Sequence, residues 1–152
     1  MRAVVQRVIR ARVDVAESPP DERREIDRGL LVYLGVGRED GQEDARVIVE
    51  KVANLRILAD AGGKMNQSVL QLGGQVLVVP ALTVQADARK GRRPSLDQAA
   101  EPDLARRLFV AVCEGLESAG VSVARGVFGA HMEVDAVNDG PICILLDSQR
   151  LF

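Results

Sequence analysis

Apolar positions along this chain fall into short alternating or continuous runs, the pattern of a protein rich in β-strands. Residues 2–9 alternate between apolar and polar side chains, as a half-buried strand does. Residues 29–36 and 76–79 are continuous apolar runs, which predicts buried strands. The complete set of predicted strands is 2–9, 12–16, 29–36, 76–79, 121–127, 132–137 and 142–147.

Two segments have the period of an α-helix instead. A helix is predicted over about 42–56, with acidic residues at its start and an apolar stripe formed by Ala45, Ile48, Val52 and Leu55. A second is predicted from Pro102 to Ala119, where Gly120 suits a C-terminal cap. Its apolar positions follow an i, i+4 series: Leu104, Leu108, Val112 and Leu116. Many strands with two helices indicate an α+β fold, not an alternating βαβ pattern.

Glycine and proline mark the connections between these elements. Residues 18–21 read as a loop and 60–64 as a tight turn, and Pro80 is expected to end the strand before it. The segment 138–141, Asn-Asp-Gly-Pro, lies between two apolar runs and is predicted to be a rigid turn. Proline fixes φ, and the bond before it can be cis at little cost, so such a turn can aim two carbonyl oxygens in one direction.

One charged residue falls on an apolar strand face. Arg7 alternates with Ala3, Val5 and Ile9, so its guanidinium is predicted to be partly buried and to need acceptors. Two kinds of acceptor remain open, namely a carboxylate or the backbone carbonyls of a constrained turn.

Length and charge narrow the class of protein. A chain of 152 residues, 47% apolar and 28% charged, suits a single domain over 1–152. A formal net charge of −2 argues against a broad nucleic-acid footprint but allows binding of a short nucleic-acid end. With no tryptophan and one tyrosine, a stacking platform for several bases is not expected. The chain has no membrane-length apolar window and no signal-peptide pattern, and its two cysteines lack metal-like spacing, so we expect a cytoplasmic protein with reduced thiols.

The scarcity of histidine limits the chemistry further. His131 is the single histidine, so a Ser-His-Asp or Cys-His triad would have to use it, and its surroundings are typical of a polar loop or strand residue. Together with two cysteines it could supply at most three such zinc ligands. We therefore expect no metal and no cofactor.

The segment after the strand 76–79 could still carry chemistry. Thr83 is the only hydroxyl in the run 79–84, and three interpretations remain open. It could be an ordinary strand residue, or a nucleophile, although no base is evident beside it. Alternatively, the backbone N–H groups of Leu82 and Thr83 could bind a developing oxyanion, for which one donor is worth about 3 kcal/mol.

A cationic loop follows this segment. It contains Arg89, Lys90, Arg92 and Arg93 around Gly91. Such a loop is either a solvated surface feature or a phosphate-binding element, because guanidinium and ammonium groups suit phosphate oxygens.

Taken in order, several segments make the chain resemble the D-aminoacyl-tRNA deacylase (D-tyrosyl-tRNA deacylase) family. The matching segments are Met-Arg-Ala-Val-Val-Gln-Arg-Val (1–8), Gly-Leu-Leu-Val (29–32), Lys-Val-Ala-Asn-Leu-Arg-Ile (51–57), Gly-Lys-Met-Asn (63–66), Ala-Asp-Ala-Arg-Lys-Gly-Arg-Arg-Pro-Ser (86–95), Gly-Val-Phe-Gly-Ala (126–130) and Val-Asn-Asp-Gly-Pro (137–141). No single segment is decisive, but the ordered set is specific and covers essentially the whole chain.

The resemblance implies a homodimer of α+β subunits, with mixed, mostly antiparallel, barrel-like sheets and two principal helices. It implies cleavage of the ester that joins a D-amino acid, or glycine, to the 3′-terminal ribose of tRNA. It places a cis Gly140–Pro141 bond, with Asn138 beside it, in the partner subunit's active site, where its carbonyls reject L-amino acids. Arg7 would hold this motif in orientation.

The resemblance also implies which residues act. Hydrolysis would be substrate-assisted, with backbone groups of Ala81, Leu82 and Thr83 positioning the ester and the ribose 2′-hydroxyl helping to activate water. The expected tRNA-binding residues are Arg89, Lys90, Arg92, Arg93, Phe128 and Met132. Aminoacyl-tRNA and a second subunit are the expected partners, and neither a metal nor a membrane is implied.

The chain departs from the family pattern at the reactive segment. The usual Ser-Gln-Phe-Thr-Leu is here Pro-Ala-Leu-Thr-Val (80–84), which keeps only Thr83. Cys143 replaces a usual threonine, His131 stands where aspartate is common, and the loop at 18–21 is longer than usual. Two alternatives therefore stay open: a paralogous deacylase that acts on another mischarged aminoacyl-tRNA, and a catalytically degenerate protein that binds tRNA ends.

Overall fold

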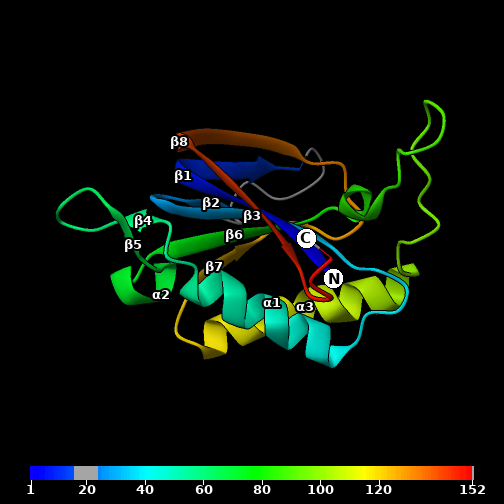
Figure 1. Ribbon diagram of the computed structural model, residues 1–152, viewed down its shortest axis with the longest axis horizontal. Coiled ribbons are helices and arrows are strands. Elements are labelled where there is room, and N and C mark those ends of the chain that lie inside the picture. The colour runs from blue at the N-terminus through cyan, green and yellow to red at the C-terminus, as the bar shows by residue number, and fades with distance from the viewer. Residues whose placement is uncertain (16–23, 152) are drawn as a thin grey trace.

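The computed structural model describes residues 1–15 and 24–151, and a mixed sheet forms its centre (Figure 1). The strand order is β2-β1-β3-β6-β7, β8 pairs with β1 along nearly its whole length, and the sheet curves into a nearly closed barrel. The strands of this sheet are β1 (Arg2–Asp14), β2 (Glu25–Ile26), β3 (Gly29–Gly35), β6 (Gln75–Pro80), β7 (Ser122–Arg125) and β8 (Glu133–Asp147). The expected loop at 18–21 lies outside the described residues.

Two main helices cover one face of this sheet (Figure 1). They are α1 (Gln42–Asn54) and α3 (Pro102–Ser118), which confirms the two predicted helices and the α+β class. In α3 the predicted stripe is buried at Leu108, Val112 and Leu116, while Leu104 is half-buried. These side chains join α1 and the sheet in one apolar core, the main source of stability in a domain of this size.

The connections between the parallel strands differ from the prediction that the chain has no alternating βαβ pattern. β3 and β6 are parallel, as are β6 and β7, and a main helix lies in each connection between them. The chain therefore contains two βαβ-type crossovers, although its other strand pairs are antiparallel. Continuous apolar runs fit this arrangement because a parallel strand is buried on both faces.

The N-terminal strand is longer than predicted, and its buried face changes. Segments 2–9 and 12–16 were expected to be separate strands, but β1 runs unbroken from Arg2 to Asp14. Ile9 is 45% exposed, unlike Ala3 and Val5, which belong to the core under the helices. Val8 belongs to a second buried cluster, together with Ala11 and Val13. The register between β1 and β8 shifts on either side of Val8, so strict alternation does not continue from Val8 to Ala11.

β8 is likewise a single strand, where two strands and a turn were predicted. Both halves of β8 pair with β1, and the segment 138–141 forms an irregularity within it. Val8 pairs with Asn138 and Gln6 pairs with Cys143, so Arg7 alone faces the residues 139–142. Figure 1 shows β1 and β8 bending together sharply at its left side, where the second half of β8 turns back toward the right of the view.

Two smaller elements flank this bend. β4 (Leu58–Ala59) and β5 (Met65–Gln67) form a hairpin around the turn predicted at 60–64. The carboxylate of Asp60 accepts the backbone N–H groups of Gly62 and Lys64, which closes the turn. A short helix, α2 (Val69–Leu72), was not predicted, because four residues are too few to display a helical period.

The two cysteines lie in opposite environments, and both are free. Cys113 is fully buried in α3, and burial raises the pKa of its thiol to about 12, whereas Cys143 is exposed on β8.

We expect a thiol reagent such as DTNB to modify one thiol per chain in the native protein and two after denaturation. At neutral pH the raised pKa alone lowers the thiolate fraction of Cys113 about a thousandfold. Two rapidly reacting native thiols would contradict the assigned burial of Cys113.

Candidate active site

A pocket of about 430 Å³ opens where β3 and β6 end. Because these strands are parallel, their carboxyl ends meet at one edge of the sheet, where open α/β sheets commonly bind ligands. The lining is mainly apolar and comes from the strand ends, the segment after β6, α3 and the segment before β8. It consists of Leu34, Val36, Pro80, Ala81, Leu82, Ala100, Pro102, Ala105, Arg106, Phe109, Phe128, Gly129, Ala130 and Met132.

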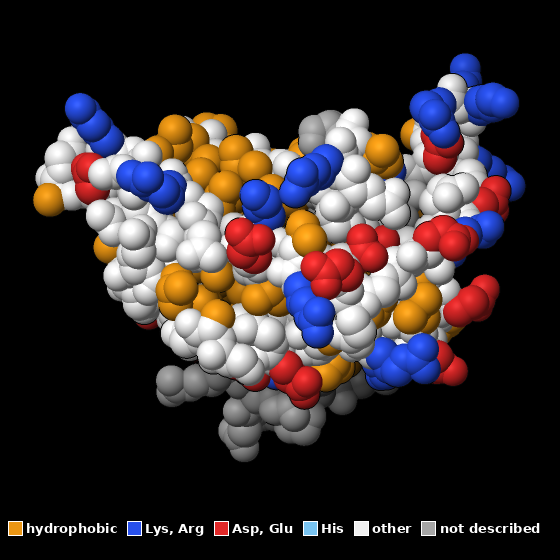
Figure 2. Space-filling view, turned by 60° about the horizontal axis from the view of Figure 1, so that its bottom comes forward, with side chains coloured by type: hydrophobic (Ala, Val, Ile, Leu, Met, Phe, Trp, Pro, Cys, Tyr) orange, Lys and Arg blue, Asp and Glu red, His pale blue; other side chains and the backbone are white. Residues whose placement is uncertain are grey.

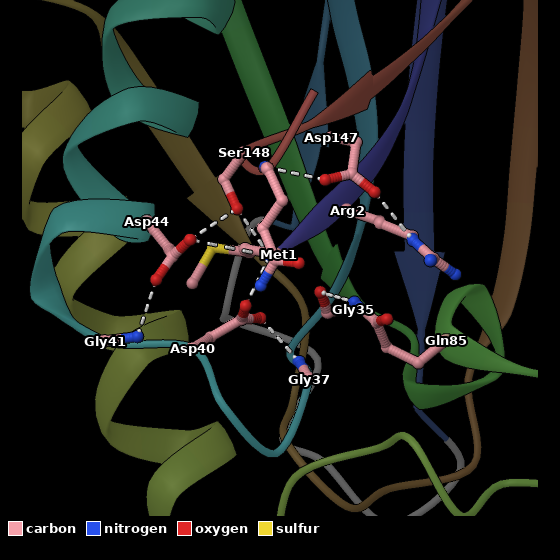
Figure 3. Close-up of polar contacts among 11 residues, drawn as sticks. Met1, Arg2, Gly35, Gly37, Asp40, Gly41, Asp44, Gln85, Asp147 and Ser148 are labelled. Atoms are coloured by element: carbon pink, nitrogen blue, oxygen red, sulfur yellow. Dashed lines mark hydrogen bonds and ion pairs between the residues drawn. The ribbon is translucent and has the colours of Figure 1, made fainter. Parts of the chain in front are cut away.

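The segment after β6 is a short 3-10 helix, η1 (Leu82–Gln85), held tightly against β3. The N–H of Ala81 donates to the carbonyl of Leu34 at 2.8 Å, and the side-chain amide of buried Gln85 donates to the carbonyl of Gly35 at 2.7 Å (Figure 3). A Cβ atom at Gly35 would lie 2.8 Å from the Cβ of Val84, so only glycine allows this approach.

Polar contacts hold the adjoining ends of the chain beside η1 (Figure 3). The α-amino group of Met1 contacts the buried carboxylate of Asp40 at 2.5 Å and the hydroxyl of Ser148 at 2.6 Å. Asp40 also accepts the N–H of Gly37 at 2.6 Å. These contacts fix the segment that leaves β3, and with it one wall of the pocket.

The start of η1 presents two backbone donors. The N–H groups of Leu82 and Thr83 occupy its first positions, where a helix offers no internal acceptor. Neither group has a hydrogen-bond acceptor among the residues that the structure describes. Leu82 and Ala81 line the pocket, whereas the Thr83 side chain is exposed and lies outside the lining. The interpretation of Thr83 as a strand residue is wrong, because β6 ends at Pro80, as predicted for that proline.

The segment 126–132 covers the pocket from the other side. The N–H of Gly126 donates to the carbonyl of Val78 at 2.8 Å, and a Cβ at Gly126 would lie 3.0 Å from both the Met132 sulfur and Pro80. This close approach brings Phe128 and Met132, two of the predicted tRNA-binding residues, into the lining.

α3 supplies residues that the sequence analysis did not single out. Phe109 lies 6.4 Å from Phe128 between ring centroids, and the guanidinium carbon of Arg106 lies 4.7 Å from the Phe128 centroid. The sequence could have indicated these residues through their spacing, because Pro102, Arg106 and Phe109 fall on one helix face. That spacing identifies a face, but not what the face contacts.

The cationic loop forms an arm that projects from the pocket side (Figures 1 and 2). Paired backbone hydrogen bonds between Asp87 and Ser95, both 2.8 Å, close its base. The Arg89 guanidinium binds the Asp87 carboxylate at 2.6 Å and lowers the pKa of that carboxyl to about 2, so the pair stays ionised above that pH. The remaining predicted cations of this arm are exposed and have no ion-pair partner among the described residues: Lys90, Arg92 and Arg93.

At the bend in β1 and β8, Arg7 uses both kinds of acceptor that the sequence left open. Its side chain is 12% exposed, and its Nε lies 3.3 Å from the Asp139 carboxylate and 3.1 Å from the Asp139 carbonyl. A terminal nitrogen donates to the carbonyl of Ile57, beside β4, at 2.8 Å. The Gly140–Pro141 bond is cis, and Asn138, Gly140 and Pro141 are exposed.

The predicted site residues therefore form two separate groups within one chain. Arg7 pairs with Leu30 at the start of β3, whereas η1 is attached to Leu34 at its end. Leu30 and Leu34 are four strand residues apart, which places them about 13 Å from each other along β3. In Figure 1 the bend lies at the left and the segment after β6 at the right. Arg7, Asn138, Gly140 and Pro141 consequently do not reach the pocket of the same chain.

The remaining candidates lie outside the pocket lining. His131 is exposed just before β8, and Cys143 is exposed beyond the bend. Among residues 1–15 and 24–151, no three His, Cys, Asp or Glu side chains gather closely enough to hold a metal ion. None of the helices in those ranges has the length and apolar character needed to cross a membrane.

Known proteins resemble the chain over nearly its full length. The family model for D-Tyr-tRNA(Tyr) deacylase matches residues 4–147. D-aminoacyl-tRNA deacylases from Anaeromyxobacter dehalogenans and Thermosipho africanus are 54% and 46% identical to it, each over 100% of both chains.

Solved structures show the same fold. A structure described as a c-Myc DNA unwinding element binding protein superposes with a TM-score of 0.88 at 35% identity, covering 97% of this chain and 98% of that chain. Another, described as a probable eukaryotic D-amino acid tRNA deacylase, superposes with a TM-score of 0.81 at 18% identity, covering 95% and 97%.

Proposed function

This chain belongs to the D-aminoacyl-tRNA deacylase family and is a hydrolase of D-aminoacyl-tRNA, and we propose that the pocket beside η1 is where the ester is cleaved. The observation that carries the proposal is the match of residues 4–147 to the family model, which includes every segment of the pocket. An apolar pocket with an aromatic ring and two uncommitted N–H donors suits the aminoacylated 3′-terminal nucleoside of tRNA.

In the proposed reaction, water attacks the ester carbonyl and the ribose 3′-oxygen leaves with a proton, giving the free amino acid and tRNA. The N–H groups of Leu82 and Thr83 stabilise the oxyanion of the tetrahedral intermediate. The 2′-hydroxyl of the same ribose helps to activate the water, so no protein base is needed. Pro80 and Ala81 differ from the usual family residues, but neither difference removes these two donors.

Chiral selection is proposed to act between two subunits. The bend that carries Gly140 and Pro141 lies beside the start of β3, whereas η1 lies beside its end, so these two residues do not reach the η1 of the same chain. A second copy of the chain therefore has to supply the Gly-Pro motif to this pocket. Arg7 fixes the Asp139 carbonyl next to this motif, which holds the exposed turn in one orientation. Ile9 and Leu145, 45% and 58% exposed, provide apolar surface for a subunit contact.

Selection by rejection has a consequence for the smallest substrate. Glycine has no side chain, so carbonyls that exclude the Cβ substituent of an L-amino acid do not exclude glycine. Gly-tRNA is therefore proposed as a second substrate.

Release of amino acid from three charged tRNAs tests this function. The purified protein is mixed with D-Tyr-tRNA, L-Tyr-tRNA and Gly-tRNA, and free amino acid is followed over time. Rapid release from D-Tyr-tRNA and Gly-tRNA alone is the expected result. Release from L-Tyr-tRNA would instead favour a paralogous deacylase, and binding without release at micromolar protein would favour a degenerate tRNA-end-binding protein.

The arm is proposed to bind the tRNA backbone. We expect Lys90→Gln and Arg92→Gln each to weaken tRNA binding and to reduce the slope of log Kd against log salt concentration by about 0.7–0.9, the contribution of one phosphate contact. Arg46→Gln is the matched control, because Arg46 is exposed on α1 and its substitution changes the net charge by the same amount. Equal slopes for all three variants would indicate that the arm makes no phosphate contact.

A further inference from the structure

Arg106 is the cation of the pocket lining, and its guanidinium contacts an aromatic ring. It projects from α3 on the same face as Pro102 and Phe109, and its guanidinium lies over the Phe128 ring at 4.7 Å. No carboxylate lies within ion-pair distance of Arg106 among the described residues.

The contact with Phe128 leaves the hydrogen-bonding capacity of Arg106 unused. A cation over an aromatic face is held by the charge distribution of the ring, which accepts none of the five guanidinium N–H groups in conventional hydrogen bonds. Arg106 is exposed, so these donors are accessible from the pocket rim. The donor arrangement of a guanidinium matches two oxygens of a phosphate group.

The pocket and this cation together match the chemistry of a nucleotide. An apolar pocket of about 430 Å³ with an aromatic ring suits a base and ribose, while a cation at its rim suits the attached phosphate. We propose that Arg106, which lies over the Phe128 ring, binds the 5′-phosphate of the terminal nucleotide of the substrate. This inference rests on the proposed function of the pocket and adds the residue that recognises that phosphate.

Three substrates separate a phosphate contact from simple support of the ring. They are 3′-O-D-tyrosyl-adenosine, the same ester bearing a 5′-monophosphate, and D-Tyr-tRNA. For Arg106→Gln we expect KM to rise about tenfold on the two phosphate-bearing substrates, with kcat within about twofold and no change on the nucleoside ester. Arg106→Lys keeps the charge and should recover part of the loss.

The matched control is Arg107→Gln. Arg107 is the next residue of α3, is exposed and lies outside the pocket lining, so its loss changes the net charge equally. Three results would overturn the assignment: an equal loss on the nucleoside and nucleotide esters, no loss for Arg106→Gln, or the same loss for Arg107→Gln.

Equilibrium binding keeps this test independent of turnover. The probes are AMP and adenosine, titrated into the wild-type protein and into Arg106→Gln. AMP is expected to bind the wild-type protein about tenfold more tightly than adenosine, and the two should bind Arg106→Gln equally. Absence of turnover on D-Tyr-tRNA by the wild-type protein would refute the proposed function, whereas equal binding of the two probes by the wild-type protein would refute the phosphate contact.

Discussion

Leu82→Pro is expected to lower kcat on D-Tyr-tRNA by about 10²–10³-fold, the usual effect of removing one oxyanion donor. Proline has no N–H, so the substitution deletes one of the two proposed donors. Leu82 is the first residue of η1, a position that suits proline. Ala81 has φ −140° and ψ 88°, outside the α region that a following proline disfavours. Single-turnover release of labelled tyrosine measures the effect.

Two controls keep both backbone donors while changing side chains. Leu82→Ala removes a side chain that is 53% exposed and should leave kcat within about threefold of wild type. Thr83→Ala removes the only hydroxyl of the segment and should reduce turnover by no more than about tenfold. Circular dichroism and thermal unfolding establish that each variant is folded. If Leu82→Ala is as slow as Leu82→Pro while folded, the backbone assignment is wrong.

Gly140→Ala is expected to reduce the preference for D-Tyr-tRNA over L-Tyr-tRNA by about a hundredfold, equivalent to about 2.7 kcal/mol. Gly140 has a φ of +133°, which side chains rarely adopt, and a Cβ there would lie 2.8 Å from both the backbone nitrogen and Cγ1 of Ile142. The backbone has to move to relieve this overlap, and the carbonyls that we propose exclude L-substrates move with it. The ratio of kcat/KM for the two substrates measures the change.

Gly63→Ala is the control for this substitution. Gly63 also has positive φ, +77°, but a Cβ there would meet no atom within 4 Å, and it lies in the turn between β4 and β5. It carries a comparable conformational cost without displacing the proposed selection motif. Unchanged discrimination in a folded Gly140→Ala protein would remove the role assigned to this segment. An equal loss in Gly63→Ala would point to a general effect of destabilisation.

Arg7 is a site residue whose partial burial and need for hydrogen-bond acceptors were predicted from the sequence pattern. A lone charge among apolar strand neighbours has to find hydrogen-bond acceptors, and both acceptor types anticipated from the sequence are present at Asp139. Ile9, predicted to share that face, is nevertheless exposed. Alternation reports burial only while the register is constant, and β1 shifts its register on both sides of Val8.

The surroundings of Thr83 and Arg106 were not predictable from local sequence patterns. Pro80 was predicted to end the strand before Thr83, and β6 does end there, but the turn into η1, held by the carbonyls of Leu34 and Gly35, was not predicted. Arg106 has an ordinary helix position, and its importance follows from Phe128, which a separate segment places against α3. Both depend on contacts between residues that are distant in the sequence.

The sequence by itself determined the two amphipathic helices, the buried strands at 29–36 and 76–79 and the family, because periodicity and ordered motifs are local properties of a chain. The tertiary structure alone decided that β1 and β8 bend together around Arg7, and that Gly140–Pro141 and η1 lie at opposite ends of β3. The physical reason is that strand register is set by pairing between segments more than a hundred residues apart. A one-residue change in that pairing reverses every side chain that follows.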